Sequence, residues 1–458
     1  MASIFLVNPI SGRGHLDAYA RLYSRALLEL GHRVVLVAQT DAETISYLAR
    51  NAPALAASFA FFSVDQPNRG GAAGMDSITW TQLVSKNGAL DILLRSIGVR
   101  YGKLRSQMVR IKRALGRRLL ETEFARALNL RFHSDVSRIS FNPALDCIDT
   151  VASISGEAAP DLILFLYLDM MAEQPRNIAV LDRPQSAPWA GLLFHPRLIS
   201  EPTKPVEGYF KSSKARGGLF LVPSAIPAYA KAAPNLHFAL APDVADLELP
   251  TEPSELAREI RKRAGDRTVV LQIGSIAAHK GIATLLDVIA AADPARFFFA
   301  IIGKANWESF DEHRSRIRSF YANPPKNVFL FEGYIASEPD YNSIIQACDI
   351  LYAVYQGFNS SSNSLTKAAG FRRPILVTED SLMGERVHRL KIGACAPEGN
   401  VDAILEKLGW LAGQPKDNFD FNAFQDEQSI EALKSTLFKA LGVWLSAAAS
   451  TTPHLPRN

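Results

Sequence analysis

The spacing of apolar residues in the second half of the chain predicts three buried strands, each of which ends at a glycine. The runs begin at Leu271, Arg296 and Asn327, and the glycines that end them are Gly274, Gly303 and Gly333. The carboxyl ends of parallel strands form the ligand crevice of a sheet, and a glycine there lets a ligand approach the backbone. Lys280 stands just before a helical run at 282–291, where a cation and the free amides of a helix start would face the same anion. The pattern therefore predicts an α/β domain that binds a phosphorylated ligand.

The alternation of helix and strand continues toward the C-terminus. Residues 341–348 have the pattern of a short helix, and residues 349–354 and 374–377 have the pattern of strands. A serine-rich turn at 360–364 stands at a predicted helix start, where small side chains leave several amides open to an oxyanion. The alternative is that these serines and Asn363 only cap the helix.

The first forty residues predict a second domain of the same kind. Its elements are a strand and a glycine turn within residues 4–15, a helix at 16–30 and a strand at 32–38. The turn after the first strand contains Gly12 and Gly14, but Asp17 stands where a dinucleotide site needs a third glycine, so NAD binding is set aside. Further apolar runs at 160–166 and 189–195 have the pattern of two more parallel strands.

The composition is that of an ordinary globular protein. The chain of 458 residues, 48% hydrophobic and 21% charged, is long enough for two or three domains with full cores. Its three cysteines are too few and too scattered for a metal site or a disulfide framework, which fits a reducing cytosol. No basic n-region precedes the first strand, and no apolar run approaches about twenty residues. We therefore expect a cytoplasmic protein without a signal peptide or membrane span.

A strongly basic segment lies between residues 92 and 120, with nine Lys and Arg and no acidic residue. Without these nine the chain would carry 41 basic against 46 acidic residues, a net charge of −5. Apolar residues in the segment recur every three or four positions, which predicts a basic amphipathic helix. Two interpretations remain open: a core-packed helix with a solvated basic face, or a docking surface for anionic lipid or an anionic acceptor. Nucleic acid is not an expected partner, because the segment lacks the interleaved aromatic residues that stack on bases.

Residues 269–397 resemble the donor-binding half of family 4 glycosyltransferases, retaining enzymes of the double-Rossmann (GT-B) type, and the first forty residues resemble that family more loosely. In the family a Gly-x-x-x-x-x-Lys-Gly loop holds the donor diphosphate. Gly274 and Lys280 match this loop, and Ser275 stands where an Arg is usual.

The chain departs from the family in the loop that follows the fourth strand. The family carries two glutamates separated by seven residues, one toward the donor sugar and one on the ribose hydroxyls. Lining up Pro374 with the family proline places Asn359 at the first glutamate and Lys367 at the second. An amide can still bond sugar hydroxyls, but an ammonium cannot accept from a ribose diol. We therefore expect Lys367 to hold phosphate in place of the missing Arg.

The resemblance implies an α/β fold of two Rossmann-like domains facing each other across a cleft, and a transferase that moves a sugar from a nucleotide-activated donor to a glycan or lipid-linked acceptor with retention. It implies no metal and no further cofactor. His195, at the tip of a predicted strand, would contact the donor sugar or the acceptor. Two alternatives stay open: that His195 is structural, and that His15 makes this contact instead. The implied donor-binding residues are Gly12, Gly14, Gly274, Ser275, Lys280, Gly333, Tyr334, Asn359, Ser361, Ser362, Asn363 and Lys367.

The predicted organisation places the acceptor-side domain at residues 1–240, with a helical, basic insertion at 66–155. A proline-rich, acidic linker at 241–253 leads to the nucleotide-sugar domain at 254–425, and a helix at 429–447 crosses back to the first domain. Two other functions remain open: a phosphorylase-like enzyme on the same scaffold, and a partner subunit that keeps the fold but has lost catalysis.

Overall fold

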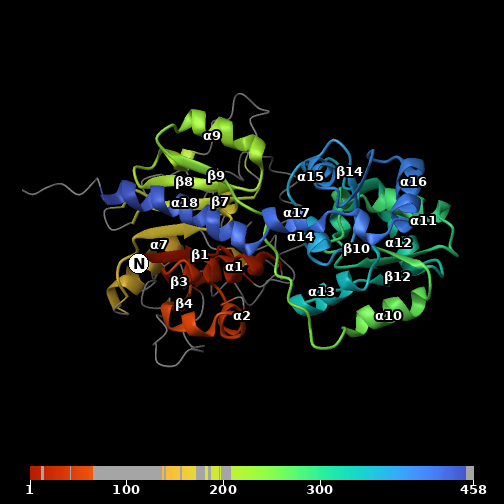
Figure 1. Cartoon of the computed structure of the whole chain (residues 1–458), viewed down its shortest axis with the longest axis horizontal. Coiled ribbons are helices and arrows are strands. Elements are labelled where there is room, and N and C mark those ends of the chain that lie inside the picture. Colours follow the sequence, from red (N-terminus) through yellow and green to blue (C-terminus); the bar gives the residue numbers. More distant parts are fainter. Residues whose placement is uncertain are drawn as a thin grey trace, which may run out of the picture.

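The computed structural model describes residues 1–11, 15–41, 43–64, 137–138, 141–154, 157–171, 181–183, 187–194, 196 and 208–449. Two parallel sheets organise these residues, and Figure 1 shows one in each half of the molecule. Among the described residues, no helix combines the length and the apolar character that crossing a membrane requires.

The first sheet has the strand order β4-β3-β1-β6-β7-β8-β9. Its strands are β1 (Ser3–Val7), β3 (Arg33–Ala38), β4 (Phe59–Ser63), β6 (Leu162–Phe165), β7 (Trp189–Leu193), β8 (Ala215–Phe220) and β9 (His237–Leu240). All six pairings are parallel. Counted along the chain, the first six strands follow the order 3-2-1-4-5-6 of a Rossmann domain. A small antiparallel pair, β2 (Ile10–Ser11) with β5 (Ser137–Arg138), lies outside this sheet.

Side chains alternate between the two faces of this sheet and build two cores. Ile4 and Leu6 belong to the core beneath α1 (His15–Glu29) and α18 (Ile430–Ala449). Phe5 and Val7 belong to the core beneath α7 (Phe141–Ile154) and α9 (Ile226–Ala232). The helices of this half are α1 (His15–Glu29), α2 (Thr44–Asn51), α7 (Phe141–Ile154), α8 (Leu168–Met171) and α9 (Ile226–Ala232), with 3-10 turns η1 (Pro53–Ser58), η6 (Gly208–Lys211) and η7 (Pro223–Ala225).

The second sheet repeats the Rossmann order, as β12-β11-β10-β13-β14-β15. Its strands are β10 (Thr268–Ile273), β11 (Phe297–Ile302), β12 (Val328–Phe331), β13 (Ile350–Ala353), β14 (Ile375–Thr378) and β15 (Gly393–Ala396). The helices around it are α10 (Glu255–Ala264), α11 (Ile282–Ala291), α12 (Arg314–Ala322), α13 (Glu338–Gln346), α14 (Asn363–Gly370), α15 (Leu382–Leu390), α16 (Val401–Ala412) and α17 (Phe421–Glu427), with 3-10 turns η8 (Ala278–Lys280), η9 (Trp307–His313) and η10 (Lys416–Asn418). The prediction of two Rossmann-like domains is confirmed.

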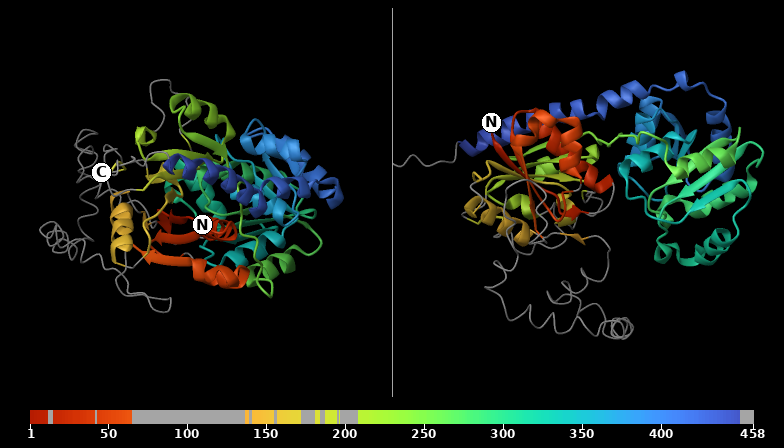
Figure 2. Two further views of the ribbon diagram at one scale, coloured as in Figure 1. Left: turned by 60° about the vertical axis from the view of Figure 1, so that its left-hand side comes forward. Right: turned by 90° about the horizontal axis from the view of Figure 1, so that it is seen from below.

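A long C-terminal helix, α18 (Ile430–Ala449), leaves the second domain and lies along the first (Figure 2). Its Leu437 and Trp444 are fully buried in the core beneath α1. The Lys434 ammonium lies 2.9 Å from the Glu29 carboxylate of α1. The chain therefore joins the two domains twice, once through the linker that follows β9 and once through the start of α18.

Candidate functional site

The strand order reverses between β10 and β13, and a Rossmann domain binds its ligand at the carboxyl ends of the strands on either side of such a point. The loops that follow these two strands are joined by a hydrogen bond, which the Gln356 amide after β13 donates to the carbonyl of His279 after β10 over 2.8 Å. Within the first of these loops, the carbonyl of Lys280 accepts from the Gln272 side chain of β10 over 3.0 Å. The loop after β10, which was predicted to bind an anion, and the loop after β13, called the donor loop below, thus form one surface.

Glycines are needed here for close packing of the chain. A Cβ on Gly303 would lie 1.7 Å from the carbonyl oxygen of Gly274, and one on Gly281 would lie 2.2 Å from that of Val354. Gly281 also has φ of +69°, a conformation that other residues rarely adopt. These glycines hold the ends of β10, β11 and β13 together, so close packing of the backbone accounts for them.

Lys280 lies at the centre of this surface, against two aromatic rings. Its ammonium is 3.9 Å from the centre of the Tyr355 ring and 5.8 Å from that of Phe358. Ring faces attract a cation, and a partly buried pair is worth about 1–2 kcal/mol. Phe358 in turn packs edge-on against Tyr355 and is stacked with His279. The aromatic residues therefore fix the half-buried lysine at the carboxyl edge of the sheet.

The Tyr355 hydroxyl connects Lys280 with the start of α14. It lies 3.3 Å from the Ser364 hydroxyl, in the first turn of that helix. Burial alone would raise the pKa of Tyr355, but the Lys280 charge and hydrogen bonds with Ser364, Lys280 and Ser362 lower it below its usual value. The tyrosine therefore lies in contact with both the lysine and the first turn of the helix.

The first turn of α14 leaves its amides open. Ser362 is the N-cap residue, and its side chain makes no capping hydrogen bond. Within the residues that the structure describes, the main-chain amides of Ser361, Ser362 and Asn363 donate to no protein acceptor. The interpretation that these serines act as side-chain caps therefore does not hold for Ser362. Open amides at a helix start, with a lysine nearby, are what an anion requires.

The remaining predicted residues are distributed along the same edge. Ser275 is exposed beside Gly274, and Tyr334 is 53% exposed after β12, where Gly333 precedes it. Asn359 is exposed, and its side-chain oxygen accepts the amide of Leu382 at the start of α15 over 2.9 Å. Outside the described residues lie Gly12, Gly14, His195 and the basic segment 92–120.

Lys367 is not at this surface, and the expectation that it holds phosphate is corrected. Its side chain is 1% exposed, and its ammonium lies 2.6 Å from the Glu338 carboxylate of α13. It also donates to the side chain of Asn342 and, over 3.0 Å, to the carbonyl of Asp246 in the linker. Burial lowers the pKa of Lys367, and the Glu338 charge opposes that shift. Three acceptors use all three N–H groups of the ammonium, which leaves none for a ligand.

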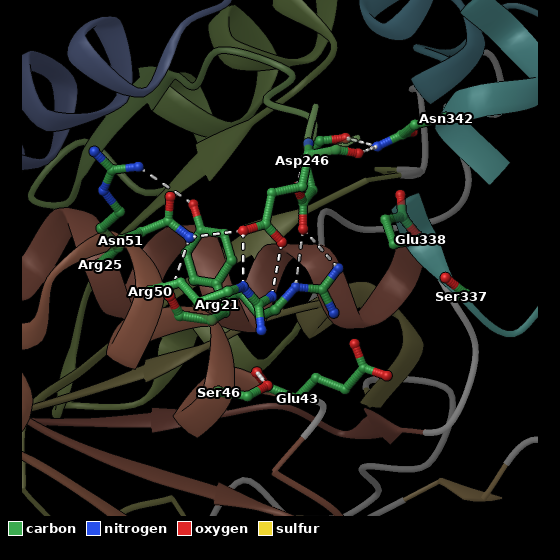
Figure 3. A network of polar contacts seen from close by, with 12 residues as sticks. Arg21, Arg25, Glu43, Ser46, Arg50, Asn51, Asp246, Ser337, Glu338 and Asn342 are labelled. Carbon is green, nitrogen blue, oxygen red and sulfur yellow. Dashed lines mark hydrogen bonds and ion pairs between the residues drawn. The ribbon is translucent and has the colours of Figure 1, made fainter. Parts of the chain in front are cut away.

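Figure 3 shows the linker side of this contact, with Asp246 between Arg21 of α1 and Asn342 of α13. The Asp246 carboxylate pairs with Arg21 at 3.0 Å, and both side chains are 4% exposed. The Asn342 amide donates to the carbonyl of Asp246 over 3.0 Å. Lys367 therefore belongs to a buried network that fastens the linker to both domains.

A cavity of about 580 Å³ lies between the domains, with Asn359 of the loop after β13 in its lining. Ser224, after β8, contributes to it from the first domain, and Asn359, Glu385 and His388 from the second. Its lining mixes carboxylates, an amide and an imidazole with apolar groups, a combination suited to a hydroxylated molecule.

No protein-family model and no curated protein sequence matches the chain. Solved structures do match it over nearly its whole length. Trehalose-6-phosphate synthase from Burkholderia multivorans has a TM-score of 0.61 at 12% identity, covering 100% of this chain and 99% of its own. Sucrose-phosphate synthase from Thermosynechococcus elongatus has 0.58 at 13%, covering 98% and 100%. Alr3699/HepE from Anabaena, solved in complex with UDP and glucose, has 0.57 at 10%, covering 96% and 100%. At such identities the likeness shows the fold, and the prediction of a GT-B architecture is confirmed.

Sequence reasoning missed Tyr355, which lies between the lysine and the helix start. Its signal was present, since it follows the predicted strand 349–354 directly. A tyrosine after an apolar run has the pattern of a strand residue, and only the turn of the chain there places its ring beneath Lys280.

Proposed function

We propose that this chain is a glycosyltransferase that binds a UDP-activated sugar at the carboxyl edge of the second sheet and transfers the sugar to an acceptor held by the first domain. The observation that carries the proposal is the convergence of Lys280 and the open first turn of α14 on Tyr355. The structurally similar proteins support the choice of ligand, since HepE was solved with UDP and with UDP-glucose.

The donor diphosphate would lie between Lys280 and the amides of Ser361, Ser362 and Asn363. Lys280 supplies a full positive charge, and the helix start supplies about half of one. The Tyr355 hydroxyl would donate to a phosphate oxygen between them. Because Ser275 supplies no charge, we expect affinity for the diphosphate to depend strongly on Lys280.

The same groups would stabilise the charge that develops on the leaving diphosphate. That charge is larger in the transition state than in the bound donor, so donors already in place favour bond cleavage. We propose that the diphosphate also helps to deprotonate the acceptor on the same face of the sugar, which gives retention without a protein nucleophile. Asn359 would bond hydroxyls of the donor sugar, and Tyr334 and Gly333 would lie toward the base.

On the acceptor side the proposal rests on the sequence. His195 stays a candidate for contact with the sugar or the acceptor, beside Gly12 and Gly14. A glycan or lipid-linked acceptor, and a peripheral membrane contact through 92–120, are the parts of the proposal that an anionic-vesicle sedimentation assay and an acceptor screen would test.

A second candidate function is a binding subunit without catalysis. It is favoured by the absence of both family glutamates, because Asn359 carries an amide and Lys367 is locked in a buried ion pair. Such a chain would bind a nucleotide sugar and not turn it over.

Incubation with UDP-glucose, with release of UDP measured over time, separates these functions. We expect slow release of UDP by hydrolysis, faster release when a suitable acceptor is added, and loss of both in a Lys280→Ala variant. Binding of UDP-glucose without release, with every acceptor tried, would establish the second function. No binding of UDP or UDP-glucose by the wild-type chain would refute the donor site itself.

A further inference from the structure

The linker between the domains is fastened directly to α14, the helix whose first turn forms the proposed phosphate site. The carbonyl of Asp243 accepts from the Thr366 hydroxyl over 2.8 Å, and the carbonyl of Asp246 accepts from Lys367 over 3.0 Å. Main-chain atoms of the linker thus bond to the second domain.

The carboxylates of the same two residues bond to the first domain. Tyr19 of α1 donates its hydroxyl to Asp243 over 2.6 Å, and Arg21 of α1 pairs with Asp246. Burial, followed by the Asp243 charge, raises the pKa of Tyr19 well above its usual value. Tyr19 therefore keeps its proton and remains a donor to Asp243.

Ser361 brings the donor loop into this contact. Its hydroxyl donates to the second oxygen of the Asp243 carboxylate and accepts from the Arg386 guanidinium over 2.5 Å. The other terminal nitrogen of Arg386 donates over 3.0 Å to the carbonyl of Leu221, at the end of β8 in the first domain. The Ser361 hydroxyl is thus the point where two chains of hydrogen bonds from the first domain meet.

The two charged side chains that bond to the Ser361 hydroxyl, those of Asp243 and Arg386, are both buried. Asp243 is 2% exposed and Arg386 is 5% exposed. In the part of the chain that the structure describes, neither has an ion-pair partner within 4.0 Å, so the Ser361 hydroxyl mediates between the two charges. A buried charge that loses its hydrogen-bond partner is costly, so this arrangement holds Ser361 in one position.

We propose that Asp243 and Arg386 are positioning residues for the donor: acting through the Ser361 side chain, they orient the amides of Ser361, Ser362 and Asn363 toward the diphosphate. The inference rests on the proposed donor site. It adds that the site is complete only when the first domain, through Tyr19 and the carbonyl of Leu221, is in the place that the structure shows. Binding of the diphosphate and the relative placement of the domains are then coupled.

The test is calorimetric titration of UDP into four full-length variants. Ser361→Ala removes the mediating hydroxyl and should weaken UDP binding about tenfold, the loss expected for displaced charge-assisted contacts. Ser361→Thr keeps the hydroxyl and should bind within about threefold of wild type. Tyr19→Phe removes the hydroxyl that donates to Asp243 from the first domain, on a residue outside the proposed donor contacts, and should also weaken binding.

The matched control is Ser254→Ala. Ser254 caps α10 by accepting the Ala257 amide over 3.3 Å, so its loss lowers thermal stability without touching the donor loop. UDP affinity equal to wild type in Ser361→Ala would overturn the inference, as would a loss no larger than that of Ser254→Ala. If Ser361→Ala does not fold, wild-type affinity in Tyr19→Phe overturns it instead. Failure of the wild-type chain to bind UDP would refute the proposed function and is a separate result.

Discussion

Replacing Lys367 by methionine should cost stability far more than ligand affinity. The substitution keeps most of the side-chain volume and removes the charge, which leaves the Glu338 carboxylate, 6% exposed, without its cation. Breaking a buried pair by removing one partner costs about 3–5 kcal/mol. The carbonyl of Asp246 and the Asn342 side chain lose a donor as well, so we expect a value in the upper part of that range.

The measurement is the free energy of unfolding in urea, with the second domain followed separately, because a two-domain chain need not unfold in one step. The control is the double variant Lys367→Met with Glu338→Gln, which removes both charges and should recover a large part of the loss. UDP affinity of Lys367→Met should fall less than that of Lys280→Ala. Unchanged stability together with a tenfold or larger loss of UDP affinity would refute the structural role and return Lys367 to the donor site.

Two further predictions concern the second domain. Gly281→Ala should lower the thermal stability more than Gly399→Ala. Both glycines have positive φ, but only at Gly281 would a Cβ meet a carbonyl oxygen, at 2.2 Å. Equal losses of stability in the two variants would show that the cost comes from φ alone and would contradict the prediction. The Asp349 carboxylate pairs with Arg261 at 2.7 Å; burial would raise its pKa, but the Arg261 hydrogen bonds and the Val269 amide hold it below its usual value. A carboxylate with a lowered pKa stabilises the fold at pH values above its usual pKa, and this stabilisation is lost as pH falls through the lowered pKa. Asp349→Asn should therefore flatten the decline in unfolding free energy below about pH 5. An unchanged decline would contradict this.

The fold was readable from the sequence because both sheets are buried on two faces. Strands of this kind are short continuous apolar runs, and the predicted runs that begin at Leu271, Arg296 and Asn327 coincide with β10, β11 and β12 of the second sheet. Glycines at the strand ends marked the edge of the sheet where the proposed donor site lies. Lys280 could be placed for the same reason, because it follows one strand and precedes one helix.

The role of Lys367 could not be read in the same way. α14 begins at Asn363 and ends at Gly370. Lys367 therefore falls on the second turn of the helix. Its partners, Glu338 and Asp246, lie 29 and 121 residues away, and no local pattern connects residues so distant.

The contacts of the linker could not be predicted from the sequence either. An acidic, proline-rich segment has the pattern of a solvated connection, yet Asp243 and Asp246 are 2% and 3% exposed. A carboxylate is buried only where donors surround it, and these donors come from α1 and from the donor loop. Only the folded chain brings those two elements to the same point.

The most direct test of the central claim is a calorimetric titration of UDP into the wild-type chain, Lys280→Ala and Lys262→Ala. Lys262 is exposed in the last turn of α10, which leads into the start of β10, whereas Lys280 follows the end of that strand. Its replacement makes the same change in net charge. We predict that wild type and Lys262→Ala bind UDP alike, and that Lys280→Ala binds about ten- to a hundredfold more weakly, the loss of about 1.5–3 kcal/mol expected for a hydrogen bond to a charged group. Equal affinity in the two alanine variants, or no binding by the wild-type chain, would contradict the account.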